Sequence, residues 1–226
     1  MYKRQITDRF AVRQGDSARF GIGIDDRSIP RAAADLLLRI KQKPRIFNTD
    51  RVGSYLLARG LKVFIDSRAV GNILPEYLAI LEHPERFALA VREYKLNAAV
   101  IDIDNRSIAA MFVRDPEWRL VHFDAQALVF FKKPFGPLIP TIDPCALLAS
   151  LRADLPPVEQ QPRFWQRAQY AGTRIAAARI LSDMAAPVPA LALLEDALRL
   201  DPRRFTDWSL LADARKRSAS TPDSPP

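Results

Sequence analysis

The chain has 226 residues, 48% of them hydrophobic and 27% charged, which is enough for one or two globular domains. Its formal net charge of +8 favours anionic partners but does not choose among nucleic acid, a lipid surface and an acidic protein. Cys145 is the only cysteine, which excludes an internal disulfide and a cysteine-based zinc site, and its apolar surroundings predict a buried thiol. There is no apolar run of about 18 residues and no signal-peptide pattern, so the sequence predicts no membrane span.

The first five residues, MYKRQ, resemble the peptide that results when transposon adapter DNA from library preparation is read as coding sequence. We therefore expect residues 1–5 to be non-native and the natural reading to begin near Ile6, with an upstream portion lost. The alternative is an ordinary basic N-terminus.

The next part of the chain alternates between predicted helices and strands. Residues 28–43 predict a helix, because apolar residues recur at helical spacing between a capping serine and a proline. A short strand over residues 45–48 and a helix over residues 53–59 follow. Residues 62–66 are the second predicted strand, and their continuous apolar core indicates a strand covered on both faces.

The alternation continues to residue 131. Residues 75–94 predict two helical pieces divided by a proline, and residues 98–101 predict a third buried strand. A short helix around residues 108–113 precedes a hairpin with strands at residues 120–123 and 128–131. Strands joined by helices, with an antiparallel hairpin at the edge, predict an α/β fold built on a small, open, mostly parallel sheet.

These patterns predict the domain organisation. The α/β domain covers residues 6–133, and a proline-rich linker with one short helix covers residues 134–162. Residues 163–217 form an all-α C-terminal helical hairpin and the start of a further helix. The serine- and proline-rich tail, residues 218–226, is expected to be disordered.

The segment ALALLEDALRLDP, residues 190–202, resembles the second helix of a tetratricopeptide repeat. The resemblance places small, bulky, small and proline residues at Ala190, Leu194, Ala197 and Pro202. In the same frame, the first helix of a following unit would contain Trp208, Leu211 and Ala212, whereas Arg174 replaces the aromatic residue of the preceding one. Because about three units are needed for an independent array, we expect these helices to dock on the α/β domain or on missing sequence. The alternative is a plain helical hairpin.

Three phrases of the α/β part occur in order at a familiar spacing: RIFNTDRVGSYLLARGLKVFIDSR, EYLAILEHPERFALAVREYKLNAAVIDID and RDPEWRLVHFDAQALVFFKK. Together they resemble, from about Gly21 to Lys133, the soluble C-terminal domain of bacterial multi-spanning membrane proteins of the dolichyl-phosphate-mannose glycosyltransferase type. Two departures are Val52-Gly53-Ser54, where that group has an aromatic residue and two glycines, and Ser67, where it has glycine. The resemblance implies an accessory domain on the extracytoplasmic (periplasmic) face of the inner membrane, beside a missing membrane-spanning part that contains the sugar-transfer chemistry.

The residues themselves contain no catalytic signature, and we expect no cofactor. Gly21-Ile22-Gly23 is half of a dinucleotide-binding pattern, but Asp26 stands at the third glycine position. His83 and His122 are the only histidines, and neither has the companions of a triad or a zinc site. We therefore predict no catalytic residues and no metal site.

One group of polar residues remains as a candidate site. In open α/β sheets, ligands bind beyond the carboxyl ends of the strands. The predicted strands end in Asn48, Asp50, Asp66, Arg68, Asp102 and Asp104. Asp66 and Arg68 could pair with each other and with Asp50 or Arg51, and Asp102 with Asp104 could hold a cation or cap the next turn. The cluster is therefore either an ion-pair and capping network or a site where Arg68 recognises a sugar, a phosphate or a partner loop.

We interpret the chain as a non-catalytic accessory or interaction domain from a membrane-embedded glycosyltransferase-like protein, whose helices bind a protein partner. Basic clusters occur at Lys41-Lys43, Lys132-Lys133, Arg203-Arg204 and Arg215-Arg217. They are scattered and no nucleic-acid reader motif accompanies them, so an anionic membrane surface is the better partner. The alternative is a self-contained soluble α/β protein that binds a small anionic or sugar ligand at the strand ends.

Overall fold

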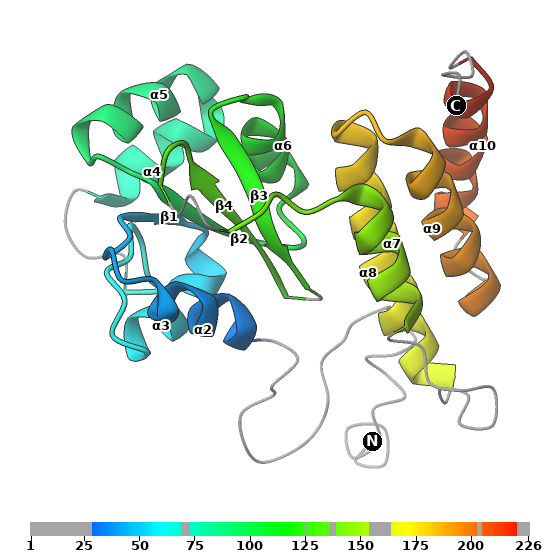
Figure 1. Ribbon diagram of the computed structural model, residues 1–226, viewed down its shortest axis with the longest axis horizontal. Helices are drawn as coiled ribbons and strands as arrows, with labels where there is room; N and C mark the ends of the chain where they lie inside the picture. The colour runs from blue at the N-terminus through cyan, green and yellow to red at the C-terminus, as the bar shows by residue number, and fades with distance from the viewer. Residues whose placement is uncertain are drawn as a thin grey trace, which may run out of the picture. The chain divides into compact units, whose positions relative to one another are not determined.

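The computed structural model describes residues 29–68, 73–124, 126–135, 139–153, 164–202 and 205–220 (Figure 1). The predictions for residues 1–5, for the half pattern at Gly21 and for most of the C-terminal tail lie outside these residues. The described chain divides between Asp143 and Pro144 into an α/β unit and a helical unit. None of the described helices is long and apolar enough to cross a bilayer.

The α/β unit contains five helices and four strands in its described residues. In chain order they are α2 (Arg31–Arg39), β1 (Ile46–Asn48), α3 (Asp50–Ala58), α4 (Ile73–Glu82), α5 (Pro84–Glu93), β2 (Ala98–Asp102), α6 (Arg106–Arg114), β3 (Trp118–Phe123) and β4 (Ala127–Lys132). The predicted helices and the predicted hairpin are therefore present, with bounds that differ by a few residues.

The sheet has the strand order β1-β2-β4-β3. Only β1 and β2 pair in parallel, and the other two pairs are antiparallel, so the expectation of a mostly parallel sheet is wrong. The hairpin does lie at one side of the sheet, with β4 against β2 and β3 outermost. The chain then returns along the outer side of β3, where the amide of Ile142 donates to the carbonyl of Leu120 over 2.8 Å.

The prediction of a strand at residues 62–66 is also wrong. Because this segment does not join the sheet, the sheet has fewer parallel strand pairs than predicted. Phe64 and Ile65 are buried as predicted, 8% and 2% exposed, but no strand is formed there. Their backbone bonds instead to the Asn48 side chain at the end of β1, which stands in for a strand-to-strand ladder. The apolar run therefore determined burial, and a single side chain replaced the backbone pairing.

Helices cover both faces of the sheet, in three layers (Figure 1). On one face, α2 and α3 pack through Ala34, Leu37 and Leu56 against strand residues such as Val100 and Val129. The other face has an aromatic cluster shared by the sheet and by α4, α5 and α6: Phe47, Tyr77, Phe87, Phe112, Trp118 and Phe130. Ring centroids in this cluster lie 4.8 to 6.2 Å apart, the range in which aromatic pairs add to simple burial.

The helical unit consists, in its described residues, of α7 (Pro144–Ala153), α8 (Phe164–Asp183), α9 (Pro187–Leu200) and α10 (Phe205–Ser220). α7 matches the helix expected within the linker, and α10 extends three residues into the predicted tail. α9 packs against α7, α8 and α10. Cys145 is exposed in the first turn of α7, so the expectation of a buried thiol is wrong.

Candidate functional site

Asn48, at the carboxyl end of β1, is completely buried and bonds within the protein. Its Oδ1 accepts hydrogen bonds from the amides of Phe64 and Ile65 at 2.8 and 3.3 Å. Its Nδ2 donates to the carbonyls of Thr49 and Ile65 at 2.8 and 2.7 Å. Both functional ends of this amide are therefore used by the backbone, and Asn48 offers nothing to a ligand.

Gly53 in α3 is required by the same arrangement. A Cβ atom built on Gly53 would lie 2.0 Å from the carbonyl oxygen of Ile65 and 2.7 Å from Nδ2 of Asn48. No side chain can replace this hydrogen without moving the backbone of the extended segment. Asn48 and Gly53 thus act together to hold residues 64–66 beside β1 and α3.

Asp102, at the carboxyl end of β2, is 2% exposed and caps the turn that leads into α6. Its Oδ1 accepts from the amide of Asp104 at 3.2 Å, and its Oδ2 accepts from Nδ2 of Asn105 at 2.5 Å. The amide of Asp102 donates to Oγ1 of Thr49 over 3.1 Å, which joins the ends of β1 and β2. Of the two uses expected for Asp102, the structure shows the capping one.

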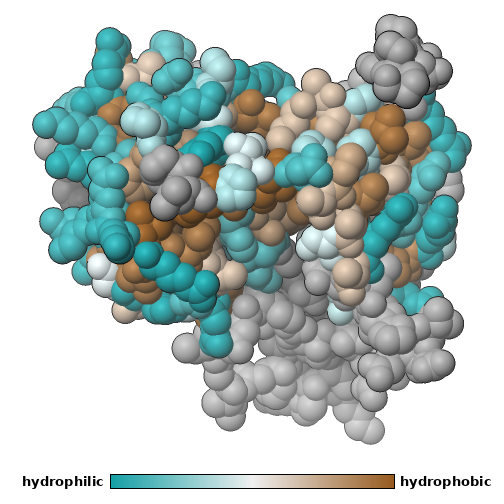
Figure 2. Space-filling view, in the orientation of Figure 1, coloured by the Kyte–Doolittle hydropathy of each residue, from teal (hydrophilic) through white to brown (hydrophobic). Residues whose placement is uncertain are grey.

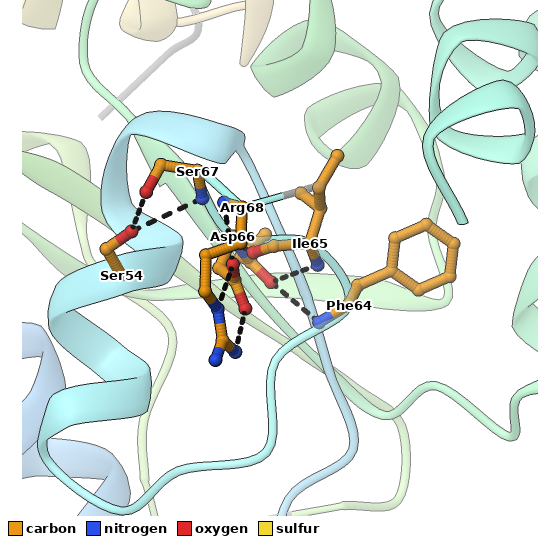
Figure 3. Close-up of polar contacts among 7 residues, drawn as sticks. Ser54, Phe64, Ile65, Asp66, Ser67 and Arg68 are labelled. Atoms are coloured by element: carbon orange, nitrogen blue, oxygen red, sulfur yellow. Dashed lines mark hydrogen bonds and ion pairs between the residues drawn. The ribbon is translucent and has the colours of Figure 1, made fainter. Parts of the chain in front are cut away.

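The exposed charges of the cluster form two separate ion pairs. Asp66 and Arg68 pair with each other, since Oδ2 of Asp66 lies 2.7 Å from Nη2 of Arg68 and Oδ1 accepts from both the amide and Nε of Arg68 (Figure 3). Arg51 does not join them but pairs with Asp104 at 2.5 Å. Hydrogen bonds from the Arg68 side chain, and then from its amide, lower the pKa of Asp66 to about 2.

Two hydroxyl groups lie next to the Asp66–Arg68 pair. The Oγ atoms of Ser54 and Ser67 are 2.7 Å apart, and the amide of Ser67 points at Oγ of Ser54 over 3.3 Å (Figure 3). Arg68 keeps 67% of its side chain exposed although Asp66 is only 14% exposed. This is the one part of the predicted cluster where a charged side chain and hydroxyl groups reach solvent together.

The hydroxyl of Tyr77 in α4 lies near the carboxyl ends of β1 and β2, a position that sequence analysis did not predict. The side chain is 5% exposed, and the amide of Asp50 donates a hydrogen bond to its hydroxyl oxygen. Burial first, and then the nearby carboxylates of Asp50 and Asp102, raise the pKa of Tyr77 to about 12 in spite of that hydrogen bond. The apolar spacing of α4 predicted a core residue, and nothing in the sequence indicated which strand end its hydroxyl would reach.

The structure thus divides the predicted cluster. Asn48 and Asp102 are buried, together with Tyr77. Arg51–Asp104 is an exposed pair, and Asp66–Arg68 joins a half-buried aspartate to an exposed arginine. Asp50 accepts a hydrogen bond from the amide of Arg51 in the first turn of α3. In the described part of the chain, no group of three or more metal-binding side chains comes together.

The histidines lie apart from this cluster. Nε2 of His122 is 2.8 Å from Oδ2 of Asp124 at the hairpin turn, and Nδ1 of His83 is 3.5 Å from Glu85. Burial raises the pKa of Asp124, but hydrogen bonds from His122 and from the amides of Ala127 and Gln126 outweigh it and hold that pKa below its usual value.

A groove of about 590 Å³ lies elsewhere in the α/β unit. Phe87 and Val91 of α5, Met111 of α6 and Trp118 of β3 are among its apolar lining. None of the predicted site residues lines it. Sequence analysis did not predict this groove, because its lining comes from segments far apart in the chain.

In the helical unit, most of the predicted repeat framework is buried. Ala190, Leu194 and Ala197 of α9 are 0 to 3% exposed, and Leu211 of α10 is 4% exposed. Pro202 follows the end of α9 and is exposed. Trp208 lies in α10, but its side chain is outside the described ones, and Ala212 is exposed rather than buried.

Two buried polar residues of this unit were missed. Arg174 of α8 is 1% exposed and donates to the carbonyls of Leu151 in α7 and Tyr170 in α8. Asp196 of α9 pairs with Nε of Arg152 in α7 at 2.6 Å. These polar contacts hold α7 in the helical unit together with its buried Leu147 and Leu151, and helical periodicity did not reveal them.

Comparisons with protein-family models, with curated proteins and with solved structures find no match to this chain.

Proposed function

We propose that this chain is a non-catalytic accessory or interaction domain. The observation that supports this most directly is the use of the polar residues at the strand ends, which bond to the backbone or to each other. Asn48 holds a neighbouring segment, Asp102 caps a turn, and Asp66 binds the adjacent Arg68. A set of side chains that already has partners is suited to fixing shape, which is what an interaction domain needs.

The resemblance to the glycosyltransferase-like membrane proteins gives the proposed setting. The first of the resembling phrases covers β1, α3 and the extended segment, and two of its residues, Asn48 and Gly53, make the contact that holds that segment in place. A phrase built around such a contact supports common ancestry. The domain would then lie at the extracytoplasmic (periplasmic) face of the inner membrane, beside a membrane-spanning part that precedes it.

The helical unit would bind a protein partner in the manner of a tetratricopeptide repeat. The support is the burial of the small residues Ala190 and Ala197 against the neighbouring helices, and the position of Pro202 after α9. Close packing at small residues is typical of such repeats, whose stability depends on the units beside them.

The test of the membrane setting is the uninterrupted gene. Long-read sequencing of the source DNA across the codon for Ile6 is expected to find membrane-spanning segments in the same frame. A start codon immediately upstream, with no such segments in frame, would overturn the proposal of a membrane-embedded parent.

The alternative function is binding of a small anionic or sugar ligand at the strand ends. The observation in its favour is the exposed Arg68 with the neighbouring hydroxyls of Ser54 and Ser67. NMR titrations with inorganic phosphate and with glucose decide it: chemical-shift changes confined to these residues in the wild type, and absent in Arg68→Gln, would support the ligand site. No change at either ligand's highest concentration would exclude phosphate and glucose as ligands.

A further inference from the structure

The fold collects positive charge at the end of the sheet opposite the predicted site. Arg45 stands directly before β1, Lys95 shortly before β2, and Lys132 is the last residue of β4. The side chain and backbone of Asn97 join these three segments. Its Oδ1 accepts from the amide of Arg45 at 2.8 Å, its amide donates to the carbonyl of Arg45 at 3.0 Å, and its carbonyl accepts from the amide of Lys132 at 3.0 Å.

Further cations come to this end because α2 and α3 both end near the start of β1. Arg39, Lys41 and Lys43 lie in the last turn of α2 and in the link to β1, and Lys62 begins the extended segment after α3. We call the whole set the basic edge: Arg39, Lys41, Lys43, Arg45, Lys62, Lys95, Lys132 and Lys133. Seven of the eight are exposed and Lys132 is half-buried.

The cations of the basic edge differ from three arginines of the same unit in having no aspartate partner among the described residues. Elsewhere Arg51, Arg59 and Arg68 each pair with an aspartate. Within the described residues, no carboxylate forms an ion pair with any of the eight cations of the basic edge. Glu117 lies next to this group, since its carbonyl accepts from the amide of Lys133, but its carboxylate forms no ion pair with any of these described cations. Like charges gathered without ion-pair partners repel one another, and an anionic partner relieves this repulsion.

Exposed leucines flank these cations. Leu38 and Leu57, in the last turns of α2 and α3, are 45% and 36% exposed. Figure 2 shows the side of the α/β unit that contains α2 and α3 as mostly hydrophilic, with hydrophobic residues between. Lysines and arginines beside exposed leucines suit the interface of an anionic bilayer, where the cations meet headgroups and the apolar side chains reach the acyl boundary.

We propose that the basic edge docks the α/β unit on an anionic lipid surface. The amino ends of β1 and β2 would face the headgroups, and the acidic carboxyl ends, with Asp66 and Asp104, would point away from them. The inference rests on the proposed function, since the membrane setting supplies this partner. Nucleic acid is the other polyanion, but its recognition would use exposed aromatic or groove-reading elements that the basic edge does not contain.

The experiment measures binding of the full 226-residue chain to large vesicles by co-sedimentation. One set of vesicles is phosphatidylcholine alone and the other contains about a quarter phosphatidylglycerol, in about 0.1 M salt. We expect binding to the anionic vesicles alone, weakened as salt rises. Each cation near such a surface strengthens binding about fivefold, so Lys43→Gln with Lys133→Gln should weaken it by about 25-fold.

The matched control removes the same net charge elsewhere. Arg51→Gln with Arg86→Gln neutralises two exposed arginines outside the basic edge and should change binding by less than about twofold. Equal losses in the two double variants would show that binding follows net charge alone and would overturn the proposal. So would the absence of binding by the wild-type chain, or a preference of the basic edge for a duplex DNA over the anionic vesicles.

Circular dichroism and thermal melting of each variant verify that it is folded, which is expected because Lys43 and Lys133 are exposed. This test and the gene test fail independently. Membrane spans upstream without vesicle binding would overturn the docking surface alone. Vesicle binding without upstream spans would overturn the proposed parent and leave the docking surface in place.

Discussion

Replacing Asn48 by alanine tests the central claim about how this fold is held together. The change leaves the amides of Phe64 and Ile65 and the carbonyl of Ile65 without their partner, in a place where Asn48 itself is 0% exposed. A buried backbone group without a partner costs about 1–3 kcal/mol. For three such groups, with one relieved by water that enters the space, we expect a loss of about 4 kcal/mol in the free energy of unfolding.

A loss of that size is a large part of the stability of an ordinary domain, which is about 5–15 kcal/mol. The assay is urea unfolding followed by the fluorescence of Trp118, in a chain whose other two tryptophans, Trp165 and Trp208, are replaced by phenylalanine. Hydrogen exchange of residues 61–68 gives a local reading of the same event, because the amides of Phe64 and Ile65 lose their acceptor.

The matched control is Asn97→Ala. Oδ1 of Asn97 accepts one hydrogen bond, from the amide of Arg45 at an exposed position, so its loss should cost about 1 kcal/mol. Asn48→Asp adds a second check, since it keeps the shape but removes the donor to Ile65, and it should destabilise the unit as well. If Asn48→Ala costs no more than Asn97→Ala, or if exchange of residues 61–68 is unchanged, the Asn48 side chain does not replace a strand pairing.

Three further predictions follow from single contacts. Gly53→Ala should lower the free energy of unfolding by about 3 kcal/mol or more in urea titrations, because its Cβ would lie 2.0 Å from the carbonyl oxygen of Ile65. In the control Gly60→Ala the added Cβ meets no atom, so the change should cost only about 1 kcal/mol for the φ of +80°. The pKa of Asp66 is about 2, so its contribution to stability is present above about pH 4 and is lost as pH falls toward 2. Carbon-detected NMR titration should show the Asp66 pKa rising toward 3.8 in Arg68→Gln, and an unchanged pKa would contradict the pairing. Arg174→Met should speed hydrogen exchange across α7, because the carbonyl of Leu151 loses its buried donor, and equal protection in both chains would show that α7 is held by other contacts.

Local patterns predicted the elements well where packing and backbone agree. The hairpin was expected at residues 120–123 and 128–131, and the structure has β3 and β4 at Trp118–Phe123 and Ala127–Lys132. Alternating apolar residues around an aspartate turn are enough to predict this, because both strands and their connection lie within fifteen residues. The order of the strands was not predictable in the same way, since the pairing of β4 with β2 depends on contacts between distant segments.

The candidate site shows the same limit. Asn48, Asp50, Asp102 and Asp104 were correctly placed at the ends of β1 and β2, because a polar residue after an apolar run marks where a buried strand stops. Asp66 and Arg68 instead follow a buried segment that forms no strand. Their orientation was not available from the sequence. Asn48 and Asp102 point inward to the backbone, while Asp66 and Asp104 point outward to arginines, and neighbours from other segments make that choice.

Hydrophobic spacing and capping residues act over a few positions, so the sequence was enough to predict which segments are helical and which are buried. It also determined that Phe64 and Ile65 enter the core. Contacts between distant segments explain why they do so without a strand, and why Lys43, Lys95 and Lys133 lie at the same end of the sheet. Long-range packing sets the hydrogen-bond partners and the neighbouring charges of each residue. Two residues about fifty positions apart leave no local pattern in the sequence from which their contact could be predicted.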